Sequence, residues 1–100
     1  MQDTIKRQDN LTMFSLYPNP FNASISFRYQ TNLKSNIFIK IYNSNGVLVD
    51  SFIKEDQLVG SHHFKWIAKD SNGKTLPSGL YFITISDEKK TDVKKALLIH

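Results

Sequence analysis

Residues 60–86 read GSHHFKWIAKDSNGKTLPSGLYFITIS, and this segment indicates the fold most clearly. In its first part, His62, Phe64 and Trp66 alternate with polar side chains, which is the period of two of a half-buried strand. In its second part, residues 79–86 are largely apolar in both phases, which predicts a central strand. A DSNG turn and a proline separate the two parts. We therefore expect two strands at the centre of a β-sandwich.

The rest of the chain shows the same alternation of short apolar segments and turns. The NSNG at residues 43–46 predicts a hairpin with a type I′ turn, because Asn-Gly tolerates positive φ angles. The apolar phase slips between Val49 and Phe52, which indicates a β-bulge. Seven short strands without a helix predict an all-β fold, a seven-stranded immunoglobulin-like β-sandwich. Outside residues 60–86, the expected strands are 13–17, 24–30, 36–42, 47–54 and 93–99.

Composition excludes several classes of function. The chain of 100 residues contains no cysteine, so disulfide and thiolate chemistry are excluded. The formal charge is +4, and the basic cluster of Lys89, Lys90, Lys94 and Lys95 is diluted by acidic neighbours, so we expect no nucleic-acid partner. No apolar run reaches the about 18 residues of a membrane-spanning helix, so we expect no direct membrane insertion.

The N-terminal segment differs from the rest. Residues 1–12 lack both periodicity and the apolar stretch of a signal peptide, so we interpret them as a linker or disordered segment. We expect the folded domain to span residues 13–100, at the end of a longer chain whose export signal lies upstream.

The sequence contains only weak candidates for catalytic or metal-binding residues. His62 and His63 point to opposite faces of a strand and cannot easily share one ion with each other, and His100 is the third histidine. The turn at residues 70–73 lacks the Glu that completes a calcium loop. No nucleophile elbow or phosphate-cradling glycine loop occurs. We therefore expect no catalysis, no metal and no cofactor.

Two features suit recognition by a partner. The bend Pro18-Asn19-Pro20 is rigid, so it loses little entropy on binding. A terminal strand at a sheet edge could dock by strand addition or by its end. Both features also have a purely structural interpretation, in which the bend seats an edge strand and the last strand closes a sheet.

Several pieces of the sequence, in order, carry a resemblance to one family. They are YPNPFN at 17–22, SISFRY at 24–29, IKIYNSNG at 39–46, Trp66 with Asp70 and Gly73, SGLYF at 78–82 and KKALLI at 94–99. Over residues 16–100 the chain resembles the type A C-terminal sorting domains of the type IX secretion system (the Por secretion system) of Bacteroidetes. These domains are similar to the immunoglobulin-like domain of flagellar hook-capping proteins.

The resemblance implies a function, a location and partners. It implies a non-catalytic secretion signal that an outer-membrane translocon recognises, while a sortase-like enzyme cuts upstream, before Tyr17. The cargo domain in the parent chain would then be anchored at the cell surface of a Gram-negative bacterium, after passage through the periplasm. Two alternatives remain open: a structural immunoglobulin-like spacer or hook-capping-type assembly domain, and a carbohydrate-binding module. The residues expected to serve translocon or sortase recognition are Pro18, Asn19, Pro20, Gly79, Tyr81, Lys94, Lys95, Ala96, Leu97, Leu98, Ile99 and His100.

Overall fold

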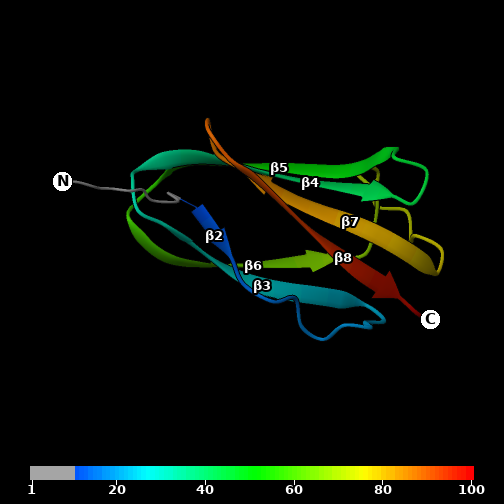
Figure 1. Cartoon of the computed structure of the whole chain (residues 1–100). Helices are drawn as coiled ribbons and strands as arrows, with labels where there is room; N and C mark the ends of the chain where they lie inside the picture. Colours follow the sequence, from blue (N-terminus) through cyan, green and yellow to red (C-terminus); the bar gives the residue numbers. More distant parts are fainter. Residues whose placement is uncertain (1–10) are drawn as a thin grey trace.

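Residues 11–100 are described by the computed structural model, and they form two antiparallel sheets without a helix (Figure 1). One sheet has the strand order β2-β3-β6 and the other β5-β4-β7-β8. The predicted all-β sandwich is confirmed, and no described segment is a helix that could cross a bilayer. The strands are β2 (Leu11–Met13), β3 (Ser24–Thr31), β4 (Ser35–Asn43), β5 (Leu48–Gln57), β6 (Gly60–Ile67), β7 (Gly79–Ser86) and β8 (Thr91–Leu98).

The core lies between the sheets, where alternate side chains of each strand point inward. In β4, Ile37, Ile39 and Ile41 are fully buried, as the predicted central position requires. Each such side chain contributes roughly 1.5–3 kcal/mol through its burial. The opposing sheet and the neighbouring strand β7 complete this core with Ile25, Phe27, Tyr29, Phe64, Trp66, Tyr81, Ile83 and Ile85.

Strands β6 and β7, which both come from residues 60–86, lie in different sheets. Strand β7 is central, as predicted, but β6 is an edge strand, so the expectation that both are central is wrong for β6. The alternation in β6 provides one apolar face toward the core, and a strand at the edge of a sheet shows the same pattern. Trp66 and Tyr81 meet across the sandwich with their ring centroids 6.0 Å apart.

The NSNG hairpin forms between β4 and β5, but its turn type differs from the prediction. Gly46 has a φ of 80°, whereas Asn45 does not have a positive φ, so the turn is not type I′. The Gly46 N–H donates to the Asn43 carbonyl at 3.0 Å, and the Asn43 side chain accepts the N–H groups of Asn45 and Val47. A type I turn followed by a left-handed glycine matches this pattern. The DSNG turn repeats it, with Gly73 at a φ of 82°.

The predicted bulge in β5 is confirmed at its start. Ile41 faces Asp50 and Tyr42 faces Leu48, so Val49 is the extra residue on that strand. Strand β5 continues to Gln57, which is three residues beyond the predicted end.

The N-terminal boundary also moves. Strand β2 begins at Leu11, which is fully buried, so the folded part starts two residues before the predicted boundary. The predicted strand at 13–17 is replaced by β2 and a separate bridge between Tyr17 and Ser26. The remainder of the predicted linker, residues 1–10, lies outside the described residues.

Candidate recognition site

The three predicted recognition segments lie together at one end of the sandwich. Strand β8 pairs with β7, so that Gly79 faces Leu98 and Tyr81 faces Ala96. The Pro-Asn-Pro bend, in the blue connection between β2 and β3, reaches the same end as the C-terminus (Figure 1). The structure therefore brings residues 18–20, 79–81 and 94–100 into one site, which we call the terminal site.

Asn19 joins the bend to the outer edge of β8. Its Nδ2 donates to the Lys95 carbonyl at 2.9 Å, and its Oδ1 accepts the Leu97 N–H at 3.0 Å. A primary amide has the donor and the acceptor of a peptide group, so this side chain acts as one residue of an added strand. The prolines on either side lack an N–H and place no competing donor beside it.

Phe21 extends this edge contact as backbone. Its N–H donates to the Leu97 carbonyl at 2.9 Å, and its carbonyl accepts the Ile99 N–H at 2.8 Å. Strand β8 lies at the edge of its sheet, which is the position that docking by strand addition requires, but its second half is covered by Asn19 and Phe21. Strand addition by a partner is therefore restricted to the first half of β8 unless the bend detaches.

The last residue is also held. The His100 N–H donates to Ser78 Oγ at 3.0 Å, and His100 Nε2–H donates to the Leu76 carbonyl at 2.7 Å. These bonds tie the end of the chain to the connection between β6 and β7. A partner that recognises residues 94–100 would therefore bind a folded surface.

Side-chain exposure divides the terminal site into two groups. Ala96, Leu98 and Tyr81 are almost completely buried, so these predicted recognition residues cannot touch a partner while the fold is intact. Leu97 and Ile99 are 39% and 48% exposed. The other exposed members are Pro18, Asn19, Pro20, Lys95 and His100, and Lys94 is half-buried.

Tyr81 supports the site from inside. Its hydroxyl donates to the Pro77 carbonyl at 2.7 Å, and burial raises the pKa of Tyr81 above its ordinary value. Gly79, where β7 begins, has a φ of 154°, a conformation that side-chain-bearing residues rarely adopt. The start of β7 therefore depends on this glycine.

Shallow grooves surround the terminal site. One, of about 280 Å³, lies between the prolines of the bend and the chain end. A second, of about 270 Å³, lies beside His100. The first is lined by Pro18, Pro20, Phe21, Asn22 and Ile99, which gives it an apolar rim suited to a side chain of a partner.

The histidines and the turn at residues 70–73, which the sequence offered as candidate metal ligands, do not come together within residues 11–100. His62 stacks on Tyr29, with ring centroids 5.3 Å apart, whereas His63 lies on the opposite face and contacts the Tyr17 hydroxyl at 2.9 Å. The Asp70 carboxylate accepts backbone N–H groups of its own turn. Among residues 11–100, no three His, Asp or Glu side chains converge as metal ligands.

Three residues of the terminal site were missed from the sequence. Phe21 belongs to the quoted YPNPFN motif, but its pairing with β8 crosses most of the chain and leaves no local signal. Ser78 and Leu76 hold His100 in the same long-range way. The segment before Tyr17, expected to hold the processing site, includes the buried side chains of Leu11, Met13 and Leu16.

Comparison with known proteins identifies the family. Residues 21–91 match the model of the FlgD Ig-like domain. The chain belongs to the FlgD Ig-like domain family. No curated protein matches it. The family match ends at residue 91, where β8 begins, so most of the terminal site lies outside the matched part of this FlgD Ig-like domain.

Solved structures share the fold of this FlgD Ig-like domain. Dimeric latent PorU from Porphyromonas gingivalis is similar over 92% of the chain, with 20% identity and a TM-score of 0.67. PorZ, a surface component of the type IX secretion system of the same organism, is similar over 86%, with 22% identity and a TM-score of 0.62. FlgD from Xanthomonas campestris is similar over 87%, with 19% identity and a TM-score of 0.62. The chain spans only 10%, 11% and 64% of these proteins, respectively.

Proposed function

We propose that this FlgD Ig-like domain is a non-catalytic C-terminal sorting domain. In this role it directs a cargo protein through the type IX outer-membrane translocon for anchoring at the cell surface. One observation carries the proposal: the Asn19 side chain binds β8, so the bend and the terminal segment form a single folded surface. The same fold in PorZ, a surface component of that secretion system, supports this role.

The partners follow from the exposed groups of the terminal site. Lys95, Leu97 and Ile99 offer one positive charge and two aliphatic side chains beside the apolar groove. The proposed translocon contact is this mixed surface. A sortase-like enzyme would act upstream of Leu11, because residues 11–13 are paired in β2 and an extended, accessible segment is needed for cleavage.

A reporter fusion tests the sorting role. The whole chain is attached to a reporter enzyme in a host that carries the type IX system, and surface activity is compared with periplasmic activity. We expect export with the intact chain and retention in the periplasm after deletion of residues 96–100. Export of both versions to the surface would contradict the sorting role.

A second role, as an immunoglobulin-like assembly domain of the hook-capping type, is favoured by the family match at residues 21–91. FlgD from X. campestris is described as a protein of hook capping in flagellar assembly. In that role, deletion of residues 96–100 would leave localisation unchanged and impair assembly. The same fusion experiment therefore separates the two proposals.

A further inference from the structure

The outer face of the four-stranded sheet carries a contiguous apolar cluster. Tyr42 on β4 lies directly opposite Leu48 on β5 and opposite Phe82 on β7. Leu80 lies opposite Leu97 on β8, one step along the same face. Side chains at opposed positions on one face are neighbours, with Cβ atoms roughly 4.5–5.5 Å apart. We call these five residues the outer apolar cluster.

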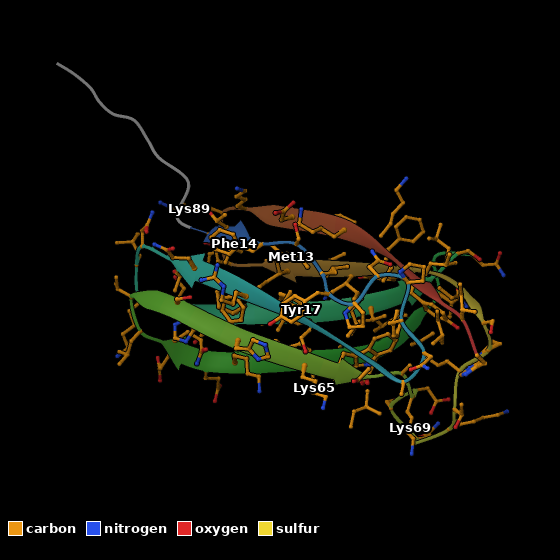
Figure 2. The ribbon with its side chains drawn as sticks, turned by 90° about the horizontal axis from the view of Figure 1, so that it is seen from below. Met13, Phe14, Tyr17, Lys65, Lys69 and Lys89 are labelled. Atoms are coloured by element: carbon orange, nitrogen blue, oxygen red, sulfur yellow. The ribbon has the colours of Figure 1, made fainter. Side chains whose placement is uncertain are left out.

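Much of this cluster is accessible. Leu48 is 47% exposed and Leu97 39%, while Tyr42, Leu80 and Phe82 are half-buried. The other sheet differs: its outward positions on β3 and β6 are mainly polar or basic, and Tyr17 and Lys65 lie over that face (Figure 2). Contiguous apolar surface on one face of a small domain marks an interaction site.

The charges beside the cluster have one sign. Lys40 precedes Tyr42 on the same face of β4, and Lys95 lies directly opposite Phe82. Neither lysine has an ion-pair partner within residues 11–100. None of the outward positions of β4, β7 and β8 holds Asp or Glu, and the acidic residues near the end of β5, Glu55 and Asp56, lie by Asn36 at the other end of the sheet. The part of the face around the cluster is therefore apolar with uncompensated positive charge.

This charge pattern selects the kind of partner. If two copies of the chain packed face to face through this surface, the lysines of one copy would lie beside those of the other. Each lysine would then lose its hydration without gaining an opposite charge. A surface with carboxylates would compensate both charges while its apolar side chains cover the cluster. We propose that the outer apolar cluster binds another protein through aliphatic or aromatic side chains bordered by carboxylates. Leu97 and Lys95 also belong to the terminal site, so this surface adjoins the proposed translocon contact, whereas Tyr42, Leu48 and Phe82 lie outside that site.

Peptide probes of defined charge test the proposal. Three synthetic amphipathic peptides share one apolar face and carry Glu, Gln or Lys on the other, and each is titrated into the isotope-labelled 100-residue chain. We expect the Glu peptide to shift the amide resonances of Tyr42, Phe82 and Leu97. It should bind about 2- to 25-fold tighter than the Gln peptide, because each of the two exposed ion pairs is worth about 1.5- to 5-fold.

Variants locate the contact. Phe82→Thr and, independently, Leu48→Thr should weaken binding of the Glu peptide. The double variant Lys40→Gln with Lys95→Gln should bind the Glu and Gln peptides with equal affinity. Ile67→Thr is the matched control, because Ile67 is 58% exposed on the other sheet. The proposal is overturned by equal affinities for the three peptides, by shifts on the other face, or by no Glu-peptide binding at millimolar concentration. Self-association through Phe82, measured by sedimentation equilibrium, would instead assign the face to a second copy.

Discussion

Asn19 Oδ1 accepts the backbone N–H of Leu97 at 3.0 Å, across 78 residues of sequence. Together with the bond from Asn19 Nδ2 to the Lys95 carbonyl, this contact closes the outer edge of β8 with a side chain. An open edge strand is a template for unwanted pairing, and native proteins cover such edges. The bend thus both protects β8 and fixes the surface that the terminal segment presents.

Replacing Asn19 by Ala should destabilise the domain and open the end of β8. Two hydrogen bonds are lost, each worth about 0.5–1.5 kcal/mol, so the free energy of unfolding should fall by about 1–3 kcal/mol. Urea denaturation measures this change, and hydrogen exchange of the Leu97 amide reports the opening. Asn22→Ala is the control, since Asn22 is exposed in the same loop. Unchanged exchange at Leu97 in Asn19→Ala would contradict the bridging role.

Two glycines should respond differently to the same substitution. Asn tolerates the left-handed region near the φ of 80° of Gly46, so Gly46→Asn should change stability by less than about 1 kcal/mol. At Gly79, where φ is 154°, Asn is strained, and the loss should be about 1–3 kcal/mol. Thermal or urea unfolding of the pair tests this contrast. Equal losses would show that the start of β7 does not require glycine.

Stability should decline at high pH in part through two buried tyrosines. Burial raises the pKa of Tyr29 and of Tyr81 above the ordinary tyrosine value of about 10. The folded state therefore holds these protons more tightly than the unfolded state, and the stabilisation is complete below pH 10 and is lost as pH rises through the folded pKa values. Unfolding free energies of the parent and of Tyr29→Phe with Tyr81→Phe, measured from pH 8 to pH 11, should show a shallower decline in the variant. Parallel curves would contradict this assignment.

The sequence predicted what depends on local alternation. Ile25, Phe27 and Tyr29 in β3, and the three isoleucines of β4, point inward as their period of two requires. What depends on a distant partner was not predictable. The pattern in residues 60–67 is the same whether the strand lies at an edge or at the centre, so β6 was misplaced.

The terminal site shows the same division. The sequence indicated a rigid bend and a terminal strand, because prolines and alternation are local signals, but alternation did not show that this strand lies at a sheet edge. It gave no sign that Asn19 binds β8, since an asparagine between two prolines has many possible partners. Likewise, the turn at residues 43–46 was expected as type I′ from its Asn-Gly pair, whereas the Asn43 side chain stabilises a different turn.

In the proposed sorting role, the exposed side chains at the end of β8 carry the recognition signal. We would measure surface export of a reporter fused to the chain with Leu97→Ser and Ile99→Ser, compared with Val59→Ser, because all three residues are exposed apolar side chains and Val59 lies outside the terminal site. Circular dichroism and urea unfolding establish that each variant is folded. We expect the Leu97 and Ile99 variant to stay in the periplasm and the Val59 variant to reach the surface. Export of the folded Leu97 and Ile99 variant at the level of the parent chain would contradict it.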